Sequence, residues 1–209
     1  DADEQMPTWF QITPARLHDS KVCKDLPLAP GQTYVFDRAY NNAAFWAAIE
    51  AAGSHFVTRP KSNLVYDVFA SRHHPNSMIV ADETIRLAGN AGTKYTAPLR
   101  RIEIFDEEKG CELAFITNDF GRDAQEIAAL YKRRWEIELF FKWIKQNLKI
   151  KRFLARNPKA IRLQIVTALI AYVLLKKLHE TNRITIPLKR VAALATNYLF
   201  NLCDINQLI

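Results

Sequence analysis

Cysteine is scarce in this sequence, and the scarcity excludes several classes of protein. The three cysteines, Cys23, Cys111 and Cys203, lie far apart and form no C-x-x-C pair. This pattern excludes the usual structural-zinc spacings, and an odd number of thiols does not suit a secreted disulfide framework. The composition is 49% hydrophobic and 24% charged, which argues against a disordered tail and for one folded domain, or one domain with a sizeable insertion.

Long apolar runs are also missing. The longest one, residues 163–175, contains 13 residues, fewer than the roughly 20 that a bilayer-crossing helix needs. We therefore expect a buried helix there and no membrane partner. The chain opens with Asp1, Asp3 and Glu4, where a signal peptide would carry basic side chains, so we expect no signal peptide and a reducing, cytoplasmic location.

The charge is concentrated in one part of the chain. The net charge is +7, but residues 132–163 alone hold eleven basic and two acidic side chains. Such a basic block favours a polyanionic partner, because Lys and Arg side chains bind nucleic-acid phosphates whatever the base sequence. A solvated helical face explains the same charges, and on charge alone both interpretations stay open.

The first sixty residues alternate between strand and helix patterns. Residues 8–13 and 33–36 are aromatic and β-branched runs too short for helices, and we predict strands for both, the second one buried on both faces. A helix is predicted over 43–52, followed by Gly53 in the position that glycine prefers after a helix. Residues 55–59 form a third predicted strand. Strand, helix and strand at this spacing predict a βαβ unit with parallel strands.

The pattern changes after residue 64. Alternating apolar and polar runs up to residue 119 predict antiparallel hairpins, one of them turning at 107–110. A long amphipathic helix is predicted from about Asp123 to Asn147, and a second helix after Pro158. The predicted architecture is an α/β sheet interrupted by a β-rich insertion and followed by a helical C-terminal part.

The long predicted helix gathers charged residues beside its apolar face. At about 100° per residue, Tyr131, Arg134, Glu138 and Lys145 lie within one stripe about 60° wide. An apolar face next to this stripe is expected to pack on the sheet, which holds Glu138 rigidly among cations. The ordinary alternative is an i,i+4 ion pair between Arg134 and Glu138. The apolar face consists of Leu130, Ile137, Phe140, Phe141, Ile144 and Leu148.

The four residues of the polar stripe, Tyr131, Arg134, Glu138 and Lys145, resemble a known signature. They reproduce the spacing Y-x2-R-x3-E-x6-K of the IS4-type insertion-sequence transposases, members of the DDE transposase group. Residues 34–40 (YVFDRAY) are similar to that family's segment around its second catalytic aspartate, and residues 56–63 (FVTRPKSN) to the strand that follows. Residues 18–20 (HDS) resemble a turn before that region, to which we assign no catalysis. The resemblance covers most of residues 7–155.

The resemblance implies a fold and a chemistry. It implies a ribonuclease H-like mixed sheet whose three carboxylates hold two Mg²⁺ or Mn²⁺ ions, and an activity that hydrolyses and transfers strands of double-stranded DNA. Asp37 and Glu138 are implied as the second and third acidic ligands. Without the resemblance, a turn or cap residue after a strand is the favoured explanation of Asp37. The implied DNA-binding residues are Tyr131, Arg134, Lys145, Lys142, Arg38, Arg59 and Lys61.

The first catalytic aspartate of that family has no counterpart here. Asp1, Asp3 and Asp19 do not match its place on the first strand of the fold. We therefore expect a truncation or a decayed copy that lacks this strand, with no catalytic activity and marginal stability. The expected regions are a partial ribonuclease H-like core (1–63), a β-rich insertion (64–119), a catalytic helix completing the core (120–155) and a helical C-terminal region (156–209).

The expected partners are transposon-end and target DNA, with a homodimer in a synaptic complex by analogy, in the nucleoid of a prokaryotic cell. Three alternatives stay open. One is a structure-specific nuclease on the same fold. Another is a non-catalytic DNA-binding remnant of a transposase. The third is a structural protein whose basic helix faces solvent, for which DNA binding would show no salt dependence.

Overall fold

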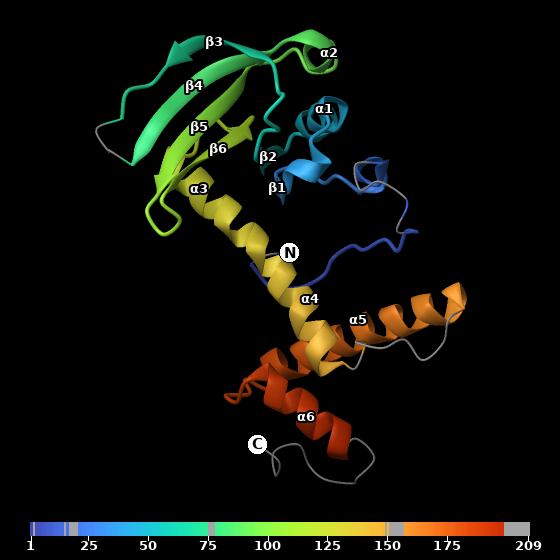
Figure 1. Ribbon diagram of the computed structural model, residues 1–209. Coiled ribbons are helices and arrows are strands. Elements are labelled where there is room, and N and C mark those ends of the chain that lie inside the picture. Colours follow the sequence, from blue (N-terminus) through green and yellow to red (C-terminus); the bar gives the residue numbers. More distant parts are fainter. Residues whose placement is uncertain are drawn as a thin grey trace. The chain divides into compact units, whose positions relative to one another are not determined.

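The computed structural model describes residues 1, 3–14, 16, 21–74, 78–148, 150 and 157–198. The turn expected at residues 18–20 lies outside the described residues. The chain divides into two compact units (Figure 1). The sheet unit is Thr13–Arg134, and the helical unit combines Asp1–Ile12 with Trp135–Ile209. The four regions expected from the sequence stay a prediction, because this division cuts across them.

The sheet unit contains one mixed six-stranded sheet, which confirms the α/β class. Its strand order is β1-β2-β6-β5-β4-β3. The first two strands are parallel and every other neighbouring pair is antiparallel, as the four adjacent ribbons β3 to β6 show (Figure 1). The strands are β1 Thr33–Phe36, β2 His55–Thr58, β3 Tyr66–Ser71, β4 Ile79–Leu87, β5 Leu99–Asp106 and β6 Cys111–Thr117.

The predicted βαβ unit is confirmed. Helix α1 (Ala43–Ala51) connects β1 to β2, and the two strands pair in parallel with Val35 opposite Val57. Gly53 has φ +69°, a left-handed conformation that glycine adopts without strain. The prediction that β1 is buried on both faces is wrong. All four of its residues are half-buried, because β1 lies at the edge of the sheet and has one neighbour among the described strands.

The predicted hairpins are confirmed, and their strands join the same sheet as β1 and β2. Strands β5 and β6 are connected by residues 107–110, with Gly110 at φ +61°. Strand β6 also pairs with β2 through Val57 and Thr117, and through Thr58 and Ile116. The β-rich segment is therefore hydrogen-bonded directly to the βαβ unit.

Helices cover both faces of the sheet. On one face, Trp46 of α1 stacks on Phe56 of β2 with ring centroids 5.1 Å apart. On the other face, Ala124 and Ile127 of α3 (Ala124–Lys132) pack against buried Val57 and Phe115. The sheet unit also contains three short helices among its described residues, the 3₁₀ helices η2 (Cys23–Asp25) and η3 (Arg38–Tyr40) and the helix α2 (Gly89–Gly92).

The helical unit has its own apolar core. Ile144 of α4 (Glu136–Asn147) packs with Tyr172 of α5 (Pro158–Thr181), and α6 (Leu188–Tyr198) contacts both helices. The N-terminal residues belong to this core, because Met6 packs against it and the Tyr172 hydroxyl donates a hydrogen bond to the Gln5 carbonyl oxygen at 2.9 Å. The predicted strand at residues 8–13 is wrong. This segment forms no strand, because strand propensity without a neighbouring backbone gives no ladder of hydrogen bonds.

The continuous helix predicted over residues 123–147 is also wrong in one respect. The segment is helical, but the 3₁₀ helix η4 (Arg133–Trp135) separates α3 from α4. The predicted apolar face is divided between two cores, since Leu130 packs with the sheet cluster and Ile144 of α4 is buried with Tyr172 of α5. Ile137 and Phe141 from the same face are 54% and 49% exposed. The 3₁₀ helix changes the residues per turn, so a single 100° period does not describe the whole segment.

Helix α5 departs from the buried helix expected at residues 163–175. Only 17% of its most apolar window is buried, and Leu163 and Leu174 are 67% and 62% exposed. By length and composition alone α5 is sufficient to span a bilayer. One such helix is weak evidence, because core helices of soluble proteins have the same length and composition. The expectation of no membrane partner therefore stays a prediction.

Candidate functional site

Asp37 lies where two parallel strands end. It directly follows β1, and residues 61–63 follow β2 at the same edge of the sheet, because parallel strands end together. A surface depression there is lined by residues 37–39 and 61–63. The Asp37 side chain is 43% exposed. Its Oδ1 accepts a hydrogen bond from the Ala39 N–H at 3.1 Å and caps the 3₁₀ helix η3 (Arg38–Tyr40).

Hydrogen bonds fix the two strand ends relative to each other. The Asn41 amide donates to the Arg59 carbonyl oxygen at 2.7 Å, and the buried Thr58 hydroxyl donates to the Asn41 Oδ1 at 2.9 Å. These bonds satisfy polar groups that would otherwise be left without partners near the core. They connect the turn after Asp37 to the backbone at Arg59, so the edge carries Asp37, Arg59 and Lys61 on a rigid support.

The last turn of α3 and the following 3₁₀ helix η4 add two residues of the predicted signature, Tyr131 and Arg134, to this edge. The Arg134 Nη1 lies 3.8 Å from the Asp37 Oδ2, and the Arg134 guanidinium carbon lies 5.9 Å from the centre of the Tyr131 ring. Tyr131 in turn packs on Phe115, with ring centroids 5.1 Å apart. The Asp37 cluster, as we call it, consists of Asp37, Arg38, Arg59, Lys61, Tyr131 and Arg134.

The electrostatics of Tyr131 report on this cluster. Burial raises the pKa of Tyr131, the positive charges of Arg134 and Arg59 oppose the rise, and the negative charge of Asp37 adds to it. The phenol is therefore protonated at neutral pH and able to donate a hydrogen bond. The charges of Asp37, Arg59 and Arg134 therefore all act on the Tyr131 phenol.

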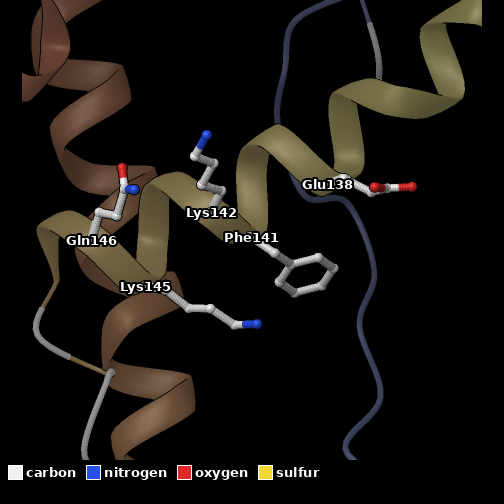
Figure 2. A pocket seen from close by; sticks show the side chains of 5 residues that line it. All are labelled: Glu138, Phe141, Lys142, Lys145 and Gln146. Carbon is white, nitrogen blue, oxygen red and sulfur yellow. The ribbon is translucent and has the colours of Figure 1, made fainter.

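The other predicted residues lie on α4 of the helical unit. Glu138, Lys142 and Lys145 are exposed and, with Phe141 and Gln146, line a second depression (Figure 2). Glu138 lies in the first turn of α4 and Lys145 in the last, where their charges complement the helix dipole. We call Glu138, Phe141, Lys142, Lys145 and Gln146 the α4 cluster.

The predicted residues thus form two groups, one in each unit. The Asp37 cluster brings together Asp37, Tyr131, Arg134 and Arg59, and the α4 cluster brings together Glu138, Lys142 and Lys145. The exposed carboxylate of Asp37 is a hard oxygen ligand of the kind that Mg²⁺ and Mn²⁺ prefer. No group of three or more His, Cys, Asp or Glu side chains suited to a metal occurs within the described ranges.

A buried ion pair behind α3 was not predicted. Arg100 Nε and Nη2 donate to both carboxylate oxygens of Asp82 at 2.8 and 2.6 Å, and His74 Nε2 lies 2.6 Å from Asp82 Oδ2. Arg100 Nη1 donates to the Arg122 carbonyl oxygen in the turn before α3. Burial works to raise the pKa of Asp82, but the hydrogen bonds from Arg100 and His74 outweigh it and hold that pKa below its ordinary value. The only sequence signal was an arginine at an inward position of a strand.

Comparison with known proteins confirms the resemblance to insertion-sequence transposases. A protein of Sinorhizobium fredii (strain NBRC 101917 / NGR234) named as transposase y4zB is 41% identical over 98% of this chain and 59% of its own length. A protein of Geobacillus stearothermophilus named as a transposase for insertion sequence element IS5377 is 32% identical over 79% of this chain and 44% of its own length. A Synechocystis protein named as a transposase for insertion sequence element IS4SA is 48% identical over 58 residues.

The chain thus spans about three fifths of the first of these relatives and less than half of the second. Residues 1–174 also match the family described as "Transposase DDE domain". This match covers the whole sheet unit, α4 and most of α5, so it includes both clusters. The chain therefore belongs to the DDE-domain transposase family of insertion sequences.

Proposed function

We propose that this chain forms part of the catalytic core of an insertion-sequence transposase, which cuts DNA at transposon ends and joins it to a target. The Asp37 cluster is the observation that carries the proposal. A carboxylate at the end of a parallel strand lies 3.8 Å from the guanidinium of Arg134, and Arg134 belongs to the same four-residue signature as Glu138. The proposed cutting and joining of DNA takes place in the nucleoid of a prokaryotic cell.

Asp37 and Glu138 serve as ligands of divalent metal in this proposal. DDE transposase domains typically use such ions, and carboxylate oxygens are the donors that Mg²⁺ and Mn²⁺ prefer. When bound, two such ions activate the attacking oxygen and stabilise the leaving oxygen during in-line displacement at phosphorus. A third carboxylate is needed to complete the set, and the described residues contain no group of three acids.

The basic residues of both clusters hold the DNA backbone. Arg134 offers a planar guanidinium for bidentate contact with a phosphate, and Lys145 and Lys142 offer ammonium groups on α4. Tyr131, kept neutral by burial, donates a hydrogen bond near the terminal nucleotides. Arg38, Arg59 and Lys61 extend the contacts along the edge at which β1 and β2 end.

The sheet edge also supports the finer parts of the proposal. In a ribonuclease H-like core, a further parallel strand pairs with β1 and ends in the missing aspartate. The half-buried β1, with one neighbour among the described strands, has an edge on which such a strand fits. The 209 residues alone are then catalytically inert and marginally stable. The β-rich segment 64–119 acts as an insertion, and two copies assemble when two DNA ends are paired.

Iron-directed cleavage tests whether Asp37 and Glu138 share one metal. Fe²⁺ bound in place of Mg²⁺ produces hydroxyl radicals with ascorbate and peroxide, and these cut the backbone beside the ion. We expect cuts near both Asp37 and Glu138, competed by Mg²⁺ and lost at both positions in Asp37→Asn and in Glu138→Gln. Asp67→Asn, which changes an exposed acid on β3, leaves the cuts unchanged. Cuts near only one of the two acids would overturn the shared site.

A non-catalytic DNA-binding remnant is the second candidate, favoured by the absence of a three-acid group from the described residues. The two candidates differ in a longer chain that also carries the part of these relatives that this chain does not span. If the first candidate holds, that chain nicks transposon-end DNA with Mg²⁺, and Glu138→Gln abolishes nicking while DNA binding persists. A structure-specific nuclease would instead cut branched DNA regardless of the end sequence.

A further inference from the structure

Phe141 is a large aromatic residue that α4 keeps on its surface. Its side chain is 49% exposed, and it lies in the α4 cluster with Glu138 and Lys145. At about 100° per residue, Lys145 falls between Phe141 and Lys142 on the helix circumference. Phe141 and Lys145 extend to the same side of α4, whereas Lys142 and Gln146 extend to the other (Figure 2). An exposed aromatic ring therefore lies beside an ammonium group.

The ring is supported from behind by the core of the helical unit. Phe141 meets Phe140 edge to face with centroids 5.3 Å apart, and Phe140 meets buried Tyr172 of α5 in the same way at 4.9 Å. Trp143 packs on the same tyrosine at 5.3 Å. This series of aromatic contacts fixes the backbone and the inner edge of Phe141, so the outer part of its ring is a supported surface.

The surrounding charges indicate what this surface binds. Lys145 and Lys142 attract an anion, and the ring offers a flat apolar face, which together fit the two parts of a nucleotide. An ammonium group binds the phosphate, and an aromatic face stacks on the base. Bases in an intact duplex are already stacked on their neighbours, so the matching partner is an unpaired base.

We propose that Phe141 stacks on an unpaired nucleobase of DNA whose adjacent phosphate is held by Lys145. The inference rests on the proposed function, because it assigns the DNA to the same helix as Glu138. It adds a distinction that phosphate contacts alone do not give: the α4 cluster favours DNA with an unpaired or extruded base over the same duplex fully paired.

Equilibrium binding of the 209-residue chain to two fluorescent duplexes tests this assignment. The duplexes are identical except that one carries a single unpaired 2-aminopurine. We expect Phe141→Leu to weaken binding to the unpaired-base DNA about tenfold, which corresponds to the loss of one stacked base. Binding to the paired duplex is expected to weaken less than about twofold. Phe141→Trp retains the preference, because stacking needs an aromatic face. The fluorescence of 2-aminopurine falls on binding to the wild type and to Phe141→Trp, and not to Phe141→Leu.

Two controls separate stacking from other causes. Phe69→Leu changes an exposed phenylalanine on β3 that also has a guanidinium, that of Arg86, 4.9 Å from its ring, and it leaves the preference unchanged. Thermal unfolding followed by circular dichroism verifies that Phe141→Leu has the same melting temperature as the wild type. Equal binding by Phe141→Leu and the wild type, or equal losses on both duplexes, would overturn the inference.

Lys145→Ala distinguishes failure of the inference from failure of the proposed function. If Lys145→Ala weakens binding to both duplexes while Phe141→Leu changes neither, only the stacking role of Phe141 fails. If Lys145→Ala and Phe141→Leu both leave binding unchanged, or the wild type binds neither duplex, the assignment of DNA to α4 fails as well, and the stacking inference fails with it.

Discussion

The Asp37 cluster and the α4 cluster differ in what holds their residues in place. The Asp37 carboxylate accepts a backbone hydrogen bond and faces Arg134, and the strand ends beside it are bonded through Asn41. The residues of the α4 cluster are exposed and owe their arrangement to the spacing of one helix. The Asp37 cluster depends on contacts between distant parts of the chain. The α4 cluster depends on the helical spacing within α4 and on the few residues of α4 that pack in the core of the helical unit.

The four-residue signature is thus divided between the two units. Tyr131 lies in the last turn of α3 and Arg134 within η4, both in the sheet unit, whereas Glu138 and Lys145 lie on α4 in the helical unit. The 3₁₀ geometry of η4 changes the helical period from one pair to the other. The four residues therefore rest on two different cores, so substitutions in one core are expected to affect one pair of signature residues first.

The largest expected effect comes from the ion pair that anchors the start of α3. Arg100→Met leaves Asp82 buried without its bidentate partner and removes the donor to the Arg122 carbonyl oxygen. We expect a loss of about 3–5 kcal/mol in the free energy of unfolding of the sheet unit, the cost of breaking a buried ion pair. Urea unfolding followed by circular dichroism measures this loss.

A matched substitution and the pH profile sharpen this prediction. Arg86→Met, at an exposed arginine over Phe69, costs about 0.5–1 kcal/mol, the value of a surface cation–π contact. Because the pKa of Asp82 is held below its ordinary value of 3.8, the ionised pair stabilises the fold fully above that pH, and this contribution is lost as pH falls through the lowered pKa. Acid unfolding of Arg100→Met is expected to lack this component. An equal loss in both methionine variants would contradict the role of burial.

The next effect concerns the core that supports the α4 cluster. Ile144→Ala removes a 2% exposed side chain packed against Tyr172, and we expect it to lower the stability of the helical unit by about 2–4 kcal/mol. Ile137→Ala, about two turns earlier on the same helix at a 54% exposed position, costs less than about 0.5 kcal/mol. Amide exchange in α4, α5 and the sheet provides the measurement, and protection in β4 and β5 is expected to persist in both variants.

The sheet unit shows how far local sequence patterns reach. The strand at 33–36, the helix from residue 43 and the hairpin turn at 107–110 follow from apolar runs and turn residues, and all three are present. These patterns do not specify which strands become neighbours. The pairing of β6 with β2 joins residues about sixty positions apart, and β1 is half-buried because pairing leaves it at an edge. The same limit explains residues 8–13, whose strand-like composition finds no partner strand.

The candidate site was predictable where spacing alone determines it. Glu138 and Lys145 lie on one helix, as their interval requires. The contact between Arg134 and Asp37 depends on how α3 packs against the sheet, which no local period reveals; the family resemblance implied both as site residues. The Arg100–Asp82 pair had no such support, because alternation along β5 marks Arg100 as inward but does not name its partner.

A smaller effect distinguishes phosphate contact from a solvated basic face on α4. Lys145→Ala is expected to reduce the slope of log affinity against log salt concentration by about 0.9, the value for one lost phosphate contact on duplex DNA. Lys177→Ala, at an exposed lysine of α5, is expected to leave that slope unchanged. Fluorescence anisotropy at four salt concentrations gives both slopes. Equal slopes for Lys145→Ala and the wild type would favour the solvated face.

The smallest effect is a change of pKa at Tyr131, and its sign tests the Asp37 cluster without any DNA. Arg134 favours the phenolate and Asp37 opposes it, so Arg134→Ala is expected to raise the pKa of Tyr131 further and Asp37→Asn to lower it. Tyr172 is the internal reference, because burial raises its pKa and its charged neighbours are Lys176 and Glu180. NMR titration of ¹³C-labelled tyrosine follows both residues. Shifts of the same sign in the two variants would mean that Asp37 and Arg134 do not act on Tyr131 as opposite charges, and the cluster would lose its electrostatic basis.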